Sequence, residues 1–241
     1  MLTLFSIMGM MPPVIKHDAD TIPEFETQYV DFVPELADSE DAISFSGSSD
    51  SYCIGIVDMV NSTKIAATLP DSMIGKYYSI FLNTMSSIVR RYGGIVVKNV
   101  GDSLLYYFPE TSDPASKNVF MQCLECGLFM IAAHGAINKM LHDEGMPSVD
   151  YRVSIDYGKV MMAKSSNSSC EDIFGPPVNT CAKINCKAAP NTIVIGGDLY
   201  QIVKDLSCFH FKEVQSYSFG FPYPYPIYSV LCTKTKCVGM S

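Results

Sequence analysis

The fold is decided by residues 95–108, which read IVVKNVGDSLLYYF. Residues 95–100 and 103–108 are both β-prone runs, and only Gly101 and Asp102 separate them. Two strand-forming runs joined by a two-residue turn that contains glycine are typical of an antiparallel β-hairpin. We therefore expect this stretch to form two adjacent strands of one sheet.

The residues before the hairpin predict a strand followed by a helix. Residues 53–57 are a short apolar run that fits a buried strand, and this strand ends at Asp58. A helix is then expected from Asp71, which can serve as its N-cap. Apolar residues recur at helical spacing within it: Ile74, Tyr77, Tyr78, Phe81, Met85, Ile88 and Val89. The pair Gly93 and Gly94 should end this helix, since glycine favours the C-terminal cap.

The residues after the hairpin predict further helices and strands. In order, we expect a helix over 113–144, a second hairpin around Tyr157 and Gly158 with strands 151–156 and 159–163, a polar loop over 164–170, a helix over 177–189, a strand over 192–195, a short helix, and strands near 209–214 and 226–231. This order predicts an α+β fold with a ferredoxin-like core, in which helices pack on a mostly antiparallel sheet.

The composition fits one large domain and argues against some partners. The chain has 241 residues and 48% of them are hydrophobic, so a substantial core can form. Its net charge of −8 argues against a broad basic surface, so no nucleic-acid partner is expected. Nine cysteines are an odd number in a chain too long for a small disulfide-stapled domain. We interpret them as mostly buried, reduced thiols of a cytoplasmic protein.

Three segments are expected along the chain. Residues 1–50 are acidic in large part and end in a serine-rich run, so we expect a partly ordered N-terminal arm or linker. Residues 51–232 contain all the predicted strands and helices and form the globular domain, and residues 233–241 form a C-terminal tail. The apolar opening of the chain, residues 1–11, is too short to span a bilayer, so no transmembrane segment is predicted.

Two carboxylates stand at the ends of predicted strands. Asp58 follows the first strand and Asp102 lies in the hairpin turn, and in a ferredoxin-like sheet the hairpin packs beside the first strand. Paired aspartates provide the hard oxygen ligands that Mg²⁺ requires, with other positions left for water and phosphate oxygens. A structural interpretation is also open, in which Asp58 caps the following helix and Asp102 only fills the turn.

Three segments resemble motifs of the class III adenylyl and guanylyl cyclases. Residues 56–63 (IVDMVNST) look like the first metal motif of that family, and residues 98–102 (KNVGD) look like the second, at a very similar separation. Residues 174–183 (FGPPVNTCAK) are similar to the third, a Gly-x-x-Val-Asn block that opens a helix. The resemblance extends from about Tyr52 to Val230, which is nearly all of the globular part.

The resemblance implies an enzyme that converts ATP into 3′,5′-cyclic AMP and pyrophosphate. Asp58 and Asp102, assisted by the main-chain carbonyl of Met59, would hold two Mg²⁺ or Mn²⁺ ions per site. One ion would activate the ribose 3′-hydroxyl and the other would neutralise the triphosphate. The family places each site at a dimer interface, with metal ligands from one subunit and nucleotide-binding residues from the other, so a homodimer is implied. No sensor module is recognisable, and an unknown regulatory partner stays open.

Lys98 and Asp172 occupy the positions at which members of the family recognise the nucleobase. Adenine presents an acceptor at N1 beside a donor at its 6-amino group, and guanine reverses that order. Lysine donates and aspartate accepts, so the pair fits adenine, whereas guanylyl cyclases usually carry Glu and Cys at these positions. The alternative is that Lys98 is an exposed strand lysine and Asp172 an ordinary loop acid.

Asn179 matches the asparagine that orients the ribose in this family, but two positions depart from the family pattern. The transition-state arginine four residues further on is Lys183 here, which keeps the charge but loses the planar guanidinium. The late loop 215–221 contains no phosphate-binding lysine. A catalytically weak or inactive domain that binds a nucleotide or a partner is therefore one alternative, and a guanylyl cyclase is another. Arg152 and Lys159, which flank the second predicted hairpin, are interpreted as structural or solvent-facing.

Overall fold

Strands and helices alternate along the described part of the chain, which is residues 43–165, 171–217 and 224–233 of a computed structural model. The elements are, in chain order, β1 (Ile43–Met59), α3 (Ser62–Ala66), α4 (Asp71–Arg91), β2 (Ile95–Val100), β3 (Ser103–Phe108), the 3₁₀ helix η2 (Pro109–Ser112), α5 (Lys117–Ala132), α6 (His134–Asp143), β4 (Tyr151–Ser165), β5 (Glu171–Phe174), α7 (Pro176–Asn185), β6 (Thr192–Gly196), α8 (Gly197–Val203), β7 (Phe209–Tyr217) and β8 (Tyr225–Cys232).

One mixed sheet organises these elements. Its strand order is β2-β3-β1-β4-β6-β8-β7, and β5 pairs with β4 off this path. β1 is antiparallel to both β3 and β4, and among the described strands only β4 and β6 pair in parallel. The order β4-β1-β3-β2, with helices connecting β1 to β2 and β3 to β4, is that of a ferredoxin-like core. The predicted fold class is therefore confirmed.

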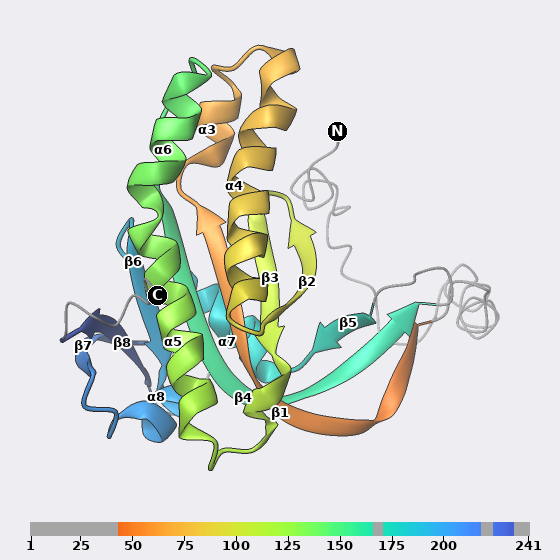
Figure 1. Ribbon diagram of the computed structural model, residues 1–241. Coiled ribbons are helices and arrows are strands. Elements are labelled where there is room, and N and C mark those ends of the chain that lie inside the picture. Colours follow the sequence, from red (N-terminus) through yellow and green to blue (C-terminus); the bar gives the residue numbers. More distant parts are fainter. Residues whose placement is uncertain (1–42, 166–170, 218–223, 234–241) are drawn as a thin grey trace, which may run out of the picture. The chain divides into compact units, whose positions relative to one another are not determined.

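The two faces of the sheet differ in what covers them. Helices α4, α5 and α6 cover one face, and α7 packs on the opposite face (Figure 1). Because successive residues of a strand point to opposite faces, Val57 and Met59 of β1 are buried under α4 and its neighbours. Ile54, Ile56 and Asp58 point instead toward the side of α7. The alternation of β1 thus separates the core from the face on which the candidate site lies.

The first helix and the hairpin follow the sequence closely. α4 starts at Asp71, although Pro70 and not Asp71 is its N-cap, and Tyr92 with Gly93 ends it. Gly93 has a φ of 79°, which glycine adopts without strain. The predicted apolar face is buried except for Ile74 and Tyr78, which are partly buried, and each fully buried aromatic side chain such as Phe81 contributes about 1.5–3 kcal/mol. β2 and β3 have the predicted bounds, and the turn residue Gly101 has a φ of 63°.

The second predicted hairpin is wrong, because β4 is one strand of 15 residues. Tyr157 and Gly158, which we expected to form its turn, pair in register with Cys53 and Tyr52 of β1. The long neighbouring strand provides hydrogen-bond partners on both sides of the tyrosine-glycine pair, so the chain stays extended.

The long β1 also revises the predicted N-terminal arm. The strand starts at Ile43, so residues 43–50, which we expected to be linker, pair with β4 as far as Ser165. The Phe45 ring contacts the Phe174 ring with centroids 5.3 Å apart. Ile43 and Phe45 alternate with serines, but both are at least half exposed, so main-chain pairing with β4 contributes more to this part of the strand than side-chain burial. The rest of the predicted arm, residues 1–42, and most of the predicted tail lie outside the described residues.

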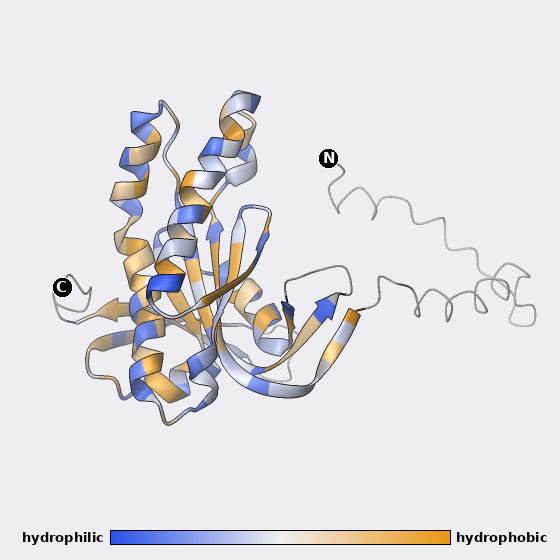
Figure 2. Cartoon of the chain, turned by 45° about the vertical axis from the view of Figure 1, so that its right-hand side comes forward, coloured by the Kyte–Doolittle hydropathy of each residue, from blue (hydrophilic) through white to orange (hydrophobic). Residues whose placement is uncertain are grey.

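The predicted helix over 113–144 is divided in two and starts later. α5 begins at Lys117, and the Asp113 side chain accepts hydrogen bonds from Ala115 and Ser116 in the turn before it. Within the described ranges, residues 117–143 are the one helical stretch long and apolar enough to cross a membrane. Figure 2 shows hydrophobic residues concentrated in α5 and more hydrophilic ones toward the end of α6. Six residues of α5 are buried in the domain core, which accounts for its apolar composition.

Candidate active site

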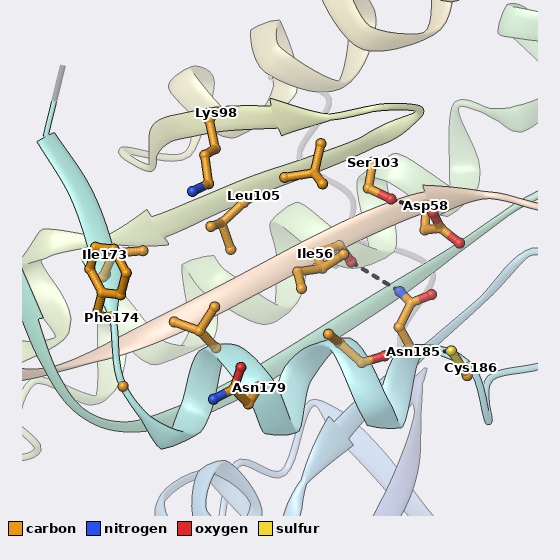
Figure 3. Close-up of a pocket in the computed structure, with 14 residues that line it drawn as sticks. Ile56, Asp58, Lys98, Ser103, Leu105, Ile173, Phe174, Asn179, Asn185 and Cys186 are labelled. Atoms are coloured by element: carbon orange, nitrogen blue, oxygen red, sulfur yellow. Dashed lines mark hydrogen bonds between the residues drawn. The ribbon is translucent and has the colours of Figure 1, made fainter. Parts of the chain in front are cut away.

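A cavity of about 490 Å³ lies between α7 and the sheet. Its lining comes from β1, β2, β3, β5 and α7, which are elements far apart in sequence. Figure 3 shows Asp58 and Ser103 at one end and Lys98 at the other, with Leu105 and Ile56 between them. The cavity thus has an end with a carboxylate, an end with a cationic side chain, and an apolar middle.

Asp58 lies at the carboxylate end, in the central strand of the ferredoxin-like core. It is paired in register with Ser103 of β3 and with Arg152 of β4. The Ser103 hydroxyl donates a hydrogen bond to the Asp58 carboxylate. Burial raises the pKa of Asp58, the Ser103 hydrogen bond lowers it, the charge of Asp102 raises it and the charge of Arg152 lowers it, with a net rise. The carboxylate is therefore partly desolvated and has both a like and an opposite charge nearby.

The two predicted metal aspartates are brought to the same end of the sheet. Asp102 directly precedes Ser103, which is bonded to Asp58, and its charge contributes to the raised pKa of Asp58. The structural alternative for Asp58 is wrong, because α3 has Asn61 as its N-cap. The Asp58 side chain bonds across the sheet to Ser103 instead of to a helix end.

The donor set at this end fits a hard divalent cation. A cation between Asp58 and Asp102 would relieve the repulsion that helps to raise the pKa of Asp58. In the described part of the chain, no group of three or more His, Cys, Asp or Glu side chains is placed to hold a metal ion. A site with two carboxylate ligands leaves positions for water and phosphate oxygens, as Mg²⁺ requires. The Met59 side chain is buried on the opposite face, so only its main chain could contribute.

Arg152, which our sequence analysis interpreted as structural or solvent-facing, lies beside Asp58. It stands opposite Asp58 in the ladder between β1 and β4, and its charge acts on that carboxylate. Its Nε atom is buried, and the described part of the chain offers it no hydrogen-bond partner. A buried guanidinium N–H without a partner is costly, and a bound anion would satisfy it. The pairing of Asp58 with Arg152 in the ladder between β1 and β4 was the missing information, since the local sequence does not reveal which strands are neighbours.

Of the predicted base-recognition pair, Lys98 lines the other end of the cavity, and Asp172 is bonded to it. The Lys98 ammonium donates to the Asp172 carboxylate across 74 residues of sequence. The Ile173 main-chain N–H donates to the second Asp172 oxygen at 2.8 Å, which fixes the orientation of the carboxylate. Their side chains are 46% and 32% exposed, so both remain accessible to a ligand. β5, the strand that places Asp172, was not predicted.

Helix α7 carries the two remaining predicted residues. Asn179 lines the cavity together with Ala182 and Asn185, whereas Lys183 is exposed and is not part of the lining. Asn185 fixes the helix to the sheet, because its amide donates to the Ile56 carbonyl oxygen at 3.3 Å (Figure 3), to another strand carbonyl and to a serine hydroxyl. Asn179 therefore has a defined position two turns before this anchor.

The start of α7 depends on a glycine. Gly175 has a φ of 156°, and a Cβ atom there would lie 2.7 Å from the Lys159 carbonyl oxygen. The glycine thus lets the chain pass close to β4 before the helix begins, which explains its place in the third motif.

Loop 215–221, which lacks the phosphate-binding lysine of the family, lies only partly within the described residues. Residues 215–217 extend β7, and residues 218–223 lie outside the described residues.

A second cavity of about 810 Å³ lies beside the start of α7 and is lined by Asp156, Pro177 and Tyr225 among others. Asp156 is 1% exposed, and the Tyr225 hydroxyl lies 2.9 and 3.1 Å from its two carboxylate oxygens. Burial raises the pKa of Asp156 to about 7, although hydrogen bonds from Tyr157 and Tyr225 lower it in part. Our sequence analysis did not single out this acid.

Comparisons with known proteins identify the family and the fold. A family model described as the adenylate and guanylate cyclase catalytic domain matches residues 46–220. An adenylate cyclase of Streptomyces coelicolor is 25% identical over 142 residues, which are 59% of this chain and 31% of that protein. A cytidylate cyclase of Staphylococcus aureus is 23% identical over 152 residues, 61% of this chain and 36% of that protein. The chain spans about a third of the length of these curated relatives.

Solved structures show the same fold. The adenylyl cyclase CyaB of P. aeruginosa superposes with a TM-score of 0.71 at 20% identity, covering 78% of this chain and 97% of that one. A guanylyl cyclase superposes with a TM-score of 0.69 at 20% identity, covering 78% and 95%. At such identities the likeness concerns the fold and does not identify the nucleotide substrate.

Proposed function

The chain belongs to the family of adenylate and guanylate cyclase catalytic domains, and on that premise we propose that it converts ATP into 3′,5′-cyclic AMP and pyrophosphate. One observation carries the proposal. The cavity of each subunit is lined at one end by Asp58, which lies near Asp102, and at the other by Lys98, which is bonded to Asp172, so a two-fold dimer would set the carboxylate end of one subunit against the base end of its partner. The first end suits the metal-bound triphosphate, and the second suits the adenine edge.

The reaction requires the ribose 3′-oxygen to attack the α-phosphorus while the bond to the pyrophosphate oxygen breaks. Divalent cations held by Asp58, Asp102 and the Met59 carbonyl would supply activation of the hydroxyl and neutralisation of the triphosphate. Ser103 orients the Asp58 carboxylate through its hydrogen bond. Arg152 places a guanidinium with a buried, unsatisfied Nε beside this carboxylate, where it can bind a phosphate oxygen.

The remaining residues position the nucleotide. Asn179 lines the cavity from α7 and is assigned to the ribose, while Lys183 on the same helix is assigned to the charge that develops on the α-phosphate. Lysine offers a point charge without the planar fork of arginine, so we expect a lower rate than an arginine would give. Lys98 and Asp172 select adenine because they pair a donor with an acceptor.

The active form in this proposal is a homodimer with two sites. In each site Asp58, Asp102 and Arg152 come from one subunit, and Lys98, Asp172, Asn179 and Lys183 come from the other. Large apolar side chains are exposed on the paired ends of β1 and β4, namely Ile43, Phe45 and Met161, at 56%, 50% and 44%. Apolar patches of this kind mark interaction surfaces. Mg²⁺ or Mn²⁺, a cytoplasmic location and a regulatory partner belong to the same proposal.

The test is a product assay with a binding control. Purified protein is incubated with ATP and Mn²⁺, cyclic AMP is quantified by mass spectrometry, and the solution mass is measured in parallel. We expect cyclic AMP and a dimer. ATP binding without product from a confirmed dimer would favour the alternative of an inactive nucleotide-binding domain, and preferential turnover of GTP would favour a guanylyl cyclase.

A further inference from the structure

The bonded pair of Lys98 and Asp172 constrains what a nucleobase must present to it. Because Lys98 is a donor without acceptor capacity and ionised Asp172 is an acceptor only, the ligand has to place an acceptor before Lys98 and a donor before Asp172. The Ile173 N–H holds one Asp172 oxygen, so the other oxygen, which accepts from Lys98, is the one available to a base. The pair therefore selects the order of hydrogen-bond acceptor and donor along one edge of the nucleobase. It does not distinguish a purine from a pyrimidine.

Two of the four common bases have this edge. Adenine places the N1 acceptor beside its 6-amino donor, and cytosine places the N3 acceptor beside its 4-amino donor. Guanine and uracil place a ring N–H donor beside a carbonyl acceptor, which is the reverse order. At an edge defined by Lys98 and Asp172, cytosine is therefore equivalent to adenine.

Resting on the proposed function, we propose that this site recognises amino-bearing nucleoside triphosphates as a class, so that it accepts CTP as well as ATP and discriminates against GTP and UTP. The rest of the cavity supports selection by the edge of the base and not by its size. Between its two ends the walls are formed by apolar side chains such as Leu105, Ile173 and Val178. Such walls contribute contact area but no directional hydrogen bond, so they distinguish a purine from a pyrimidine only gradually.

The size of each effect follows from its physical origin. Loss of one ring removes apolar contact, which costs affinity roughly tenfold to a hundredfold. Guanine or uracil would place a donor before Lys98 and an acceptor before Asp172, which weakens binding. Because both side chains are partly exposed, water limits this loss of affinity to a similar tenfold to hundredfold. A pyrimidine that reaches the pair also draws its ribose away from the carboxylate end. CTP should thus bind better than UTP but turn over more slowly than ATP.

The experiment uses two pairs of ligands that differ only at the edge. ATP and ITP differ by an amino group against an oxo group on a purine, and CTP and UTP differ in the same way on a pyrimidine. Each competes with labelled 3′-deoxy-ATP, which has no attacking hydroxyl, on the full chain with Mn²⁺. We expect ATP over ITP and CTP over UTP by the same factor within about threefold, since the same two side chains make the distinction.

Substitutions test whether Lys98 and Asp172 cause the preference for ATP over ITP and for CTP over UTP. Lys98→Glu and, separately, Asp172→Asn should reduce both preferences together, each leaving the folded circular-dichroism spectrum unchanged. The matched control is Lys76→Glu, which breaks an ion pair of similar exposure with Glu144 away from the cavity and should leave both preferences intact. Wild-type protein alone already tests the proposal, so a variant that fails to fold does not remove the test.

The outcomes separate this inference from the proposed function. If ATP is cyclised but CTP binds no better than UTP, the inference is overturned and the cyclase proposal stands. If no triphosphate is cyclised but CTP and ATP both outcompete their oxo partners, the cyclase proposal fails and the inference stands. Equal loss of both preferences in the Lys76→Glu control would also overturn the inference, because it would show that the pair is not their source.

Discussion

The two ends of the cavity are built differently. The carboxylate end lies at the ends of β1, β3 and β4, three adjacent strands inside the sheet, where Asp58 is partly buried and bonded across the ladder. The base end joins Lys98 on the outer strand β2 to Asp172 on the four-residue strand β5 through one exposed ion pair. The chemistry is thus placed on the most constrained strands, and the recognition of the base is placed on the periphery. Substitutions at the two ends should differ in both size and kind.

The largest effect is expected at the carboxylate end. Asp58→Asn should reduce turnover of ATP at least about a hundredfold, since an amide cannot supply the charge that holds a divalent cation. The fold should persist, because burial already raises the pKa of Asp58 and the amide can still accept from Ser103. Steady-state kinetics and thermal unfolding measure the two effects. Asp143→Asn, an exposed acid on α6, is the control, and equal losses in both variants would contradict a role in catalysis.

Arg152→Met should give the next largest effect, at the same end. We expect a loss of roughly tenfold to a hundredfold in kcat/KM, because a phosphate contact is removed. The unfolding free energy should not fall, since the variant also removes a buried N–H without a partner. The acid limb of the activity profile should move to higher pH, because Arg152 lowers the pKa of Asp58. Exposed Arg91 is the control position, and a purely structural Arg152 would lower stability without moving the profile.

At the base end, Lys98→Met should act mainly on binding. The KM for ATP should rise about tenfold while kcat changes less, because the adenine edge lies far from the reacting phosphorus and is bound similarly in ground and transition states. Initial-rate measurements over a range of ATP concentrations separate the two constants. A fall in kcat with an unchanged KM would remove the contrast between the two ends.

The smallest effect concerns Asp156, which belongs to neither end. Its pKa is raised to about 7 in the folded protein against an ordinary value of 3.8, so folding is favoured while the group is protonated. This contribution is fully present below pH 4 and is lost as the pH rises to about 7. From pH 6 to pH 8 the wild type should lose about 1 kcal/mol relative to Asp156→Asn, measured by urea unfolding. A difference in unfolding free energy between the two proteins that stays constant from pH 6 to pH 8 would contradict the raised pKa of Asp156.

The sequence predicted the central parts of the molecule better than the parts that depend on neighbouring strands. The hairpin of β2 and β3 and the helix α4 follow from local patterns, and so does the placement of Asp58 beside Asp102. The length of β1 and the continuity of β4 follow from pairing between residues about 110 apart, which no local pattern reveals. The position of Arg152 beside Asp58 was not predicted for the same reason.

The 17 residues of β1 have a mechanical consequence. An extended strand is close to its maximum length, so it can be displaced along its axis but hardly stretched. The one place where its ladder with β4 is irregular lies between Phe45 and Ser49, and from Ser49 onward the pairing is continuous to Met59. A force along the strand that acts on the residues before Ser49 would therefore reach Asp58 through a main chain that can hardly lengthen.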